Sequence, residues 1–109
     1  MTEEVYGAVW QDNVVAIAVE NGNVTLASGG TETLAVRAVF GGTVASQREA
    51  NSNFTFAVEA APVATATGVA VGANTGIITA GTQAGKAVIS VTLTGYPSVE
   101  PAYVLVTVA

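Results

Sequence analysis

Cysteine and histidine are both absent from this sequence of 109 residues. Without cysteine the chain can form no disulfide and has no thiolate to act as a nucleophile or metal ligand. Without histidine it lacks the side chain that most often serves as a general base near neutral pH and that most often binds metals. These absences exclude most familiar catalytic constellations. We therefore expect a protein that is not an enzyme and that needs no cofactor.

Charged residues are also scarce, at 10% of the chain, and most of them are acidic. Three lysine and arginine residues face eight aspartate and glutamate residues, which gives a formal net charge of −5. A nucleic-acid binder needs clustered basic side chains to displace counterions, and an anionic membrane attracts polybasic segments. The charge balance therefore argues against nucleic acid as a partner. With so few charges, the surface must be hydrated through Thr, Ser, Asn, Gln and Gly, or neighbouring molecules must cover part of it.

Long apolar runs are missing as well. Residues 1–4 are acidic where a secretory signal would be basic, and no apolar segment follows them, so we expect no export signal. The uncharged stretch 60–85 is interrupted by Pro62 and by repeated glycines, which makes it unsuited to a membrane-spanning helix. We therefore expect no insertion into a membrane.

The apolar residues that are present are mostly small or β-branched, with 20 Ala and 19 Val. In residues 31–40 and 86–93 the apolar side chains follow a period of two, which is typical of half-buried strands. Segments 54–58 and 103–108 are rich in β-branched and aromatic residues, as strands prefer. The positions expected to point inward in the two alternating segments are Leu34, Val36, Ala38, Phe40, Ala87, Ile89, Val91 and Leu93.

Turns that contain glycine or asparagine separate these segments. They fall at residues 21–23, 29–30, 41–42, 74–76 and 95–97. Short strands with frequent glycine-bearing turns are typical of an all-β sandwich or barrel, and no segment has a helical period. We predict one all-β domain over residues 14–109, preceded by residues 1–13 as an N-terminal arm or first strand.

One stretch resembles a known family. Residues 76–91 read GIITAGTQAGKAVISV and are similar to the most recognisable part of the group 2 bacterial immunoglobulin-like domains. In that family, Gly and a Thr-Ala pair lead through a short loop to Gly, Ala and an Ile-containing strand. Residues 24–34 and 103–108 resemble the family's early and last strands. Phe56 stands where the family usually has a core tryptophan. The resemblance implies an immunoglobulin-like sandwich of two antiparallel sheets.

Four glycines are predicted to shape the turns of this fold: Gly30, Gly76, Gly81 and Gly85. Gly76 follows Asn74 in a turn that requires a positive φ, and Gly81 and Gly85 bracket a loop between two strands. Residues 81–87 also imitate a phosphate-binding loop. However, the glycines are one residue too close, and Ala87 stands where Ser or Thr would hold magnesium. We interpret the segment as a strand-linking loop.

Aromatic residues supply the candidates for contact with a partner, namely Tyr6, Trp10 and Tyr96, because aromatic side chains are enriched at interfaces. The alternative for the first two is an N-terminal strand that packs Trp10 onto the sandwich. Tyr96 lies between Gly95 and Pro97 in a predicted loop, so its side chain is exposed if the tip of that loop is exposed. The acidic residues are scattered and do not form an EF-hand, so we expect no metal site, with a calcium site at a loop end as the alternative.

The resemblance implies a non-enzymatic structural or binding module in one of two places. Domains of this family are displayed on tailed-phage virions and are strung along bacterial surface adhesins of the invasin and intimin type. Because the sequence begins with Met1, lacks an export signal and ends just after its last strand, we expect a virion surface protein, either a head decoration or a tail-associated protein. An adhesin module on a bacterial cell surface is the alternative, and a small hydrolase with two converging carboxylates is the third. The expected partners are neighbouring virion or surface proteins, a second copy of the chain, or a host-surface glycan.

Overall fold

The computed structural model describes residues 10–41, 46–59 and 68–109. Within these ranges the chain is all-β, and its only helical segments are two short 3-10 turns, η1 (Trp10–Asn13) and η2 (Asn51–Asn53). Among the described residues, the first strand begins at Val14. Trp10–Asn13 form a 3-10 turn and not part of a first strand.

In the described part of the chain, ten strands form three sheets, and all of the strand pairings but one are antiparallel. The four-stranded sheet has the order β2–β10–β9–β6, and β10 runs parallel to β2 and antiparallel to β9. Its members are β2 (Val24–Leu26), β6 (Phe54–Glu59), β9 (Gly85–Leu93) and β10 (Ala102–Val108).

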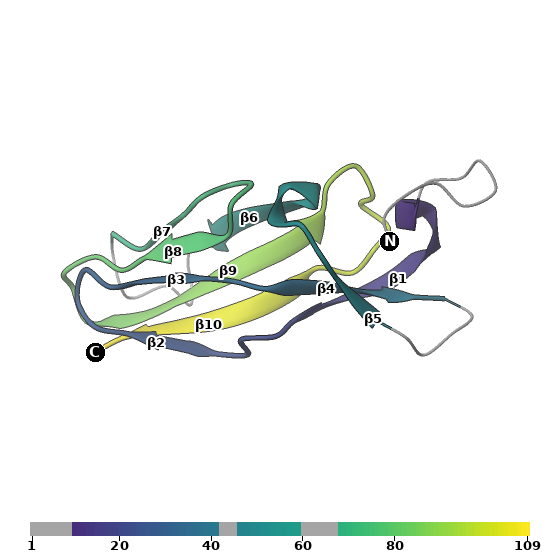
Figure 1. Cartoon of the computed structure of the whole chain (residues 1–109). Helices are drawn as coiled ribbons and strands as arrows, with labels where there is room; N and C mark the ends of the chain where they lie inside the picture. Colours follow the sequence, from purple (N-terminus) through teal and green to yellow (C-terminus); the bar gives the residue numbers. More distant parts are fainter. Residues whose placement is uncertain (1–9, 42–45, 60–67) are drawn as a thin grey trace.

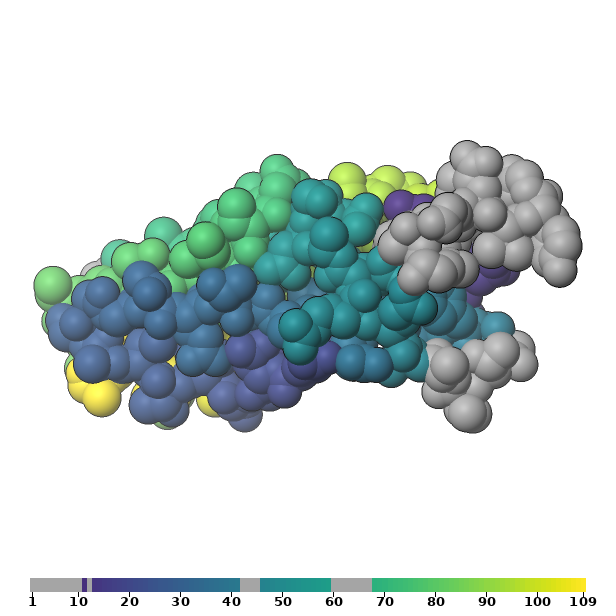
Figure 2. All heavy atoms as spheres, viewed as in Figure 1, coloured from purple at the N-terminus to yellow at the C-terminus, as the bar shows by residue number. Residues whose placement is uncertain are grey.

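The other two sheets have three strands each, in the orders β1–β4–β5 and β3–β8–β7. Figure 1 shows β3 and β4 following one another along one path in front of β9 and β10. Figure 2 shows this face of the molecule, where the blue atoms of β3 and β4 lie beside the teal atoms of β5 and η2. The members of these sheets are β1 (Val14–Val19), β3 (Thr31–Thr33), β4 (Val36–Phe40), β5 (Ser46–Glu49), β7 (Ala70–Val71) and β8 (Ile77–Thr79).

Side chains from all three sheets meet in one hydrophobic core. The alternation prediction is confirmed for seven of its eight inward positions, which are buried, while Phe40 at the end of β4 is partly buried and packs against the core. The largest fully buried side chains are Phe54 and Phe56 on β6. The arrangement is compatible with a β-sandwich that buries mainly aliphatic side chains between layers of strands.

The prediction of one continuous strand over residues 31–40 is wrong at its centre. Leu34 and Ala35 interrupt it, because their backbone N–H groups donate outside the sheet ladders, to the carbonyl of Gly76 (2.9 Å) and to Oδ1 of Asn21 (2.8 Å). The chain changes partners at this point. Thr31–Thr33 pair with β8, whereas Val36–Phe40 pair with β1 and β5.

Ser90 is a second departure from the predicted alternation, since it lies between the inward positions Ile89 and Val91 and is itself buried. It lies on β9, which has a strand on either side, between Tyr103 of β10 and Ala57 of β6. Its Oγ donates to the carbonyl of Ala57 at 3.4 Å. A small hydroxyl in the middle of a sheet is therefore covered by its neighbours and satisfied by one of them.

Candidate functional site

The four turn glycines bring distant parts of the chain together. Gly76 has φ +68° in the turn between β7 and β8. The backbone of Gly29 and Gly30 meets that of Ala80 and Gly81, where the Gly29 N–H donates to the Gly81 carbonyl (3.1 Å) and the Ala80 N–H donates to the Gly30 carbonyl (2.8 Å). These contacts continue the antiparallel pairing of β3 with β8 beyond Thr31 and Thr79.

Residues 81–87 lead directly into a strand, since β9 begins at Gly85 with φ +146°. A phosphate-binding loop of the predicted type opens onto a helix, whose N-terminal amides hold the phosphate. The helix is missing at this place in the described chain. The segment therefore has the form of a strand-linking loop.

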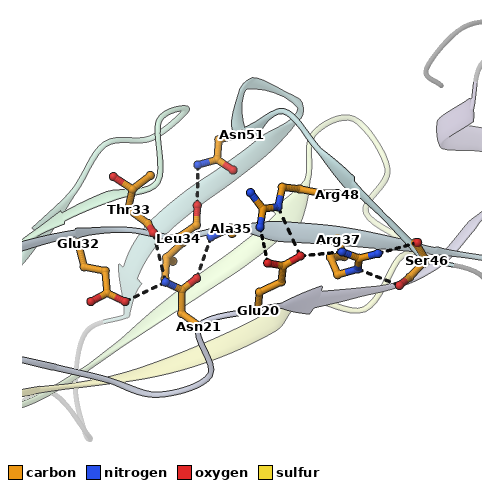
Figure 3. Close-up of polar contacts among 10 residues, drawn as sticks. All are labelled: Glu20, Asn21, Glu32, Thr33, Leu34, Ala35, Arg37, Ser46, Arg48 and Asn51. Carbon is orange, nitrogen blue, oxygen red and sulfur yellow. Dashed lines mark hydrogen bonds and ion pairs between the residues drawn. The ribbon is translucent and has the colours of Figure 1, made fainter.

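Two of the chain's three basic residues lie directly opposite each other, Arg37 on β4 and Arg48 on β5. Like charges in this position repel one another across the strands. Glu20 lies between the guanidinium groups and accepts from Nη1 of Arg37 at 2.7 Å and from Nη2 of Arg48 (Figure 3). Hydrogen bonds from Arg48 and then Arg37 lower the pKa of the Glu20 carboxyl. The carboxylate thus holds β5 against β4.

Replacing Glu20 by glutamine is expected to destabilise the protein at pH 7, because the two guanidinium groups then face each other without a carboxylate. Since folding lowers the pKa of Glu20, its contribution is complete above the ordinary carboxyl pKa and is lost as the pH falls through the lowered value. Urea unfolding of wild type and Glu20→Gln at pH 7 and at pH 2.5 measures this difference. Glu100→Gln, at an exposed position, is the control. A Glu20→Gln effect that is as large at pH 2.5 as at pH 7 would contradict the role given to the charge.

Glu49 is the one charged residue that is buried in the described part of the chain. It lies opposite the core residue Val36, so its side chain is on the inward face of β5. Its Oε2 has no hydrogen-bond partner among the described residues. Burial raises the pKa of the Glu49 carboxyl. An ionised carboxylate at this position therefore costs stability at neutral pH.

Replacing Glu49 by glutamine is expected to raise the free energy of unfolding at pH 7 by about 1 kcal/mol, because a neutral amide is cheaper to bury than a carboxylate. Since folding raises the pKa of Glu49, the wild type loses stability as the pH rises from the ordinary carboxyl value through the raised one. The gain of Glu49→Gln should therefore shrink at pH 3.5. Urea unfolding at both pH values tests this, with the exposed Glu59→Gln as control. A loss of stability at pH 7 would show that the Glu49 anion is stabilised.

A hollow of about 320 Å³ lies beside Tyr96, at the end of the four-stranded sheet. The connection from β9 to β10 forms one wall, and Thr55 of β6 contributes to the other. Tyr96 is half-buried and packs against the core while it lines this hollow. The predicted partner-contact residue therefore lies in a concave part of the surface and not at a bare loop tip.

The other two predicted contact residues do not join Tyr96 in a described site. Tyr6 lies outside the described residues, and for Trp10 the structure describes the backbone of η1 alone. Sequence reasoning also missed the most exposed large hydrophobic side chain of the described chain, Tyr103 on β10, which is 61% exposed. Its signal was present, because the inward positions Val104 and Val106 place Tyr103 on the opposite face of the strand.

The described residues were searched for a metal-binding cluster and for a membrane-spanning helix. In residues 10–41, 46–59 and 68–109, no group of three or more aspartate or glutamate side chains is arranged to hold a metal ion. The same ranges contain no helix long and apolar enough to cross a membrane. No model of a known protein family matches the chain, and no curated protein matches it either.

Proposed function

We propose that this chain is a non-enzymatic, immunoglobulin-like module displayed on a virion surface, as a head decoration or tail-associated protein. The observation that carries the fold part of this proposal is the order of strand pairing. An immunoglobulin sandwich combines one sheet of its first, second, fifth and fourth strands with another of its third, sixth and seventh. The observed pairings support the same plan if β3 and β4 count as one interrupted second strand.

The correspondence runs through every described strand except β5. The interrupted strand pairs with β1 at one end and with β8 at the other, and β8 pairs with β7. The second layer places β9 between β6 and β10, as the third, sixth and seventh strands require. The first strand of the plan then corresponds to β1 and β2 together. Its β1 part pairs with β4 in one layer, and its β2 part pairs in parallel with β10 in the other layer. Strand β5 is then an addition that extends the layer beside β4.

The exterior supports a role in contact and not in chemistry. The chain has no cysteine and no histidine, and two of its three basic residues are held by Glu20. The described strands instead expose many threonine, alanine and valine side chains, such as Thr25, Ala57 and Val15, in addition to Tyr103. Such a surface suits contact with neighbouring proteins, which are the partners we propose. The same module as part of a bacterial surface adhesin is the alternative.

The location can be tested with an antibody raised against the purified chain. We expect immunogold labelling of intact virions from the source that encodes the sequence, and peptides of the chain in the purified virions by mass spectrometry. Labelling of the bacterial envelope with no signal on virions would overturn the virion proposal in favour of the adhesin module. Light scattering of the purified chain adds the oligomeric state, since symmetric display on a capsid favours a closed oligomer.

A further inference from the structure

The hollow beside Tyr96 is lined without a single charged side chain. Two of the chain's three prolines, Pro97 and Pro101, form part of its wall together with Tyr96. Its volume of about 320 Å³ falls within the range of pockets that hold small ligands, roughly 300–1,000 Å³. In a chain with a net charge of −5, a neutral and largely apolar pocket selects a neutral ligand.

The side-chain polar atoms in this hollow are all hydroxyls. Oγ1 of Thr55 and Oγ1 of Thr94 lie 2.7 Å apart in a mutual hydrogen bond, and Oγ1 of Thr92 donates to the carbonyl of Thr55 at 3.3 Å. A hydroxyl both donates and accepts, so these groups retain capacity for further hydrogen bonds. They match a ligand whose own polar groups are hydroxyls, because each partner can then serve as donor or acceptor.

The wall formed by the β9–β10 connection is ordered before any ligand arrives. The Tyr96 N–H donates to the carbonyl of Leu93 (3.0 Å), and the Val99 N–H donates to the carbonyl of Tyr96 (3.1 Å). Val99 is buried in the core, and the two prolines further restrict the backbone. A preformed wall avoids the entropic cost of ordering a loop when a ligand binds.

Tyr103 extends this surface along the sheet. It lies two residues beyond Pro101 on β10, and side chains at that spacing share a face about 7 Å apart. Its cross-strand partner is the small residue Ser90, whose own partner on the next strand is Ala57, and Tyr103 is 61% exposed. Tyr103 therefore presents an aromatic ring among small side chains, next to the hollow and on the same side of the sheet.

We propose that this tyrosine–proline surface, made of Tyr96, Pro97, Pro101 and Tyr103 with Thr55, Thr92 and Thr94, binds a neutral saccharide. A sugar ring combines an apolar C–H face with a rim of hydroxyls, which matches aromatic rings and prolines beside threonine hydroxyls. Acidic sugars and phosphates find no counter-charge there. The cations of the chain are elsewhere, with Arg37 and Arg48 on the other layer and Lys86 at the far end of β9, hydrogen-bonded to Thr107.

The inference goes beyond the proposed location, since such a site would serve a virion protein and an adhesin equally. A polypeptide ligand is less well matched, because each of its N–H and C=O groups is fixed as a donor or an acceptor, whereas the hydroxyls of the hollow can serve as either. Proline-rich peptides, which also dock on aromatic surfaces, are therefore the competing outcome of the test.

Affinity electrophoresis of the whole chain through gels that contain one polysaccharide each tests the proposal. The neutral probes are dextran, yeast mannan, galactan, arabinogalactan and barley β-glucan, and the acidic comparison is polygalacturonate. We expect at least one neutral polymer to retard the chain, with no change in 0.5 M NaCl. Two variants are tested: the single substitution Tyr103→Ala, and the double substitution of Tyr96→Phe combined with Thr94→Val. We expect each variant to weaken that retardation at least tenfold. Ile77→Ala, at an exposed position on the other layer, should leave it unchanged.

Circular dichroism of each variant keeps folding separate from binding. Tyr103 and Thr94 are exposed, and Tyr96→Phe retains the aromatic ring. Both the single and the double variant should therefore fold like the wild type. Retardation by none of the five neutral polymers would overturn the proposal. So would retardation by polygalacturonate alone, unchanged retardation of Tyr103→Ala, or binding of poly-L-proline that Tyr103→Ala abolishes while no sugar binds. Each of these outcomes leaves the virion and adhesin assignments untouched, because those rest on immunogold labelling.

Discussion

Replacing Gly76 by alanine is expected to lower the free energy of unfolding by about 2–5 kcal/mol, from the sum of backbone strain and overpacking. Its φ of +68° is a conformation that L-residues adopt at a cost. An added Cβ would lie 2.8 Å from Nδ2 of Asn51 and 2.9 Å from Cζ of Phe56. Neither neighbour can yield cheaply, because Phe56 is buried in the core and Asn51 is held by hydrogen bonds to the carbonyls of Leu34 (2.9 Å) and Thr75 (2.7 Å).

Gly22→Ala is the matched control for this prediction. Gly22 has nearly the same φ, +65°, but an added Cβ would meet nothing within 4 Å. Alanine there should cost about 1–2 kcal/mol, from the left-handed conformation alone. Urea unfolding followed by tryptophan fluorescence and circular dichroism measures both variants. Equal losses would mean that the close approach of Asn51 and Phe56 to Gly76 has no energetic weight.

Ile78→Ala should cost about 2–5 kcal/mol, since it deletes a fully buried aliphatic side chain. Ile77→Ala, at the next residue, should change stability by less than about 1 kcal/mol, because Ile77 is 44% exposed. The two substitutions are chemically identical and lie on the same short strand, so their difference reports which face of β8 points to the core. Similar losses at both positions, measured by urea unfolding, would contradict the register of β8 between β3 and β7.

Strand character and the inward faces could be predicted from the sequence because both depend on a local pattern. A period of two is visible in the residues themselves, and burial follows it along β4 and β9. The interruption at Leu34 and Ala35 could not be predicted from the local pattern. The hydrogen-bond acceptors for their backbone N–H groups belong to Gly76 and Asn21, which are distant in the sequence. Ser90 was misplaced for a similar reason, since its cover comes from strands on both sides.

The candidate site was predictable only in part. Tyr96 was found through loop chemistry, whereas the threonines beside it come from β6 and β9 and meet only once these strands pair. Tyr103 could have been found, because the same alternation that buries Val104 and Val106 turns it outward. The contact of Glu20 with Arg37 and Arg48 depends on the register of β4 against β5, which no local pattern fixes.

The parallel pairing of β2 with β10 also determines how the fold responds to tension. A pull on the two chain ends draws β2 toward its own start and β10 toward its own end, so the two strands are forced to slide past each other. Sliding loads the paired positions Val24–Val106, Thr25–Thr107 and Leu26–Val108 simultaneously, whereas peeling would separate them one at a time. We therefore expect the pairing of β2 with β10 to resist stretching along the chain.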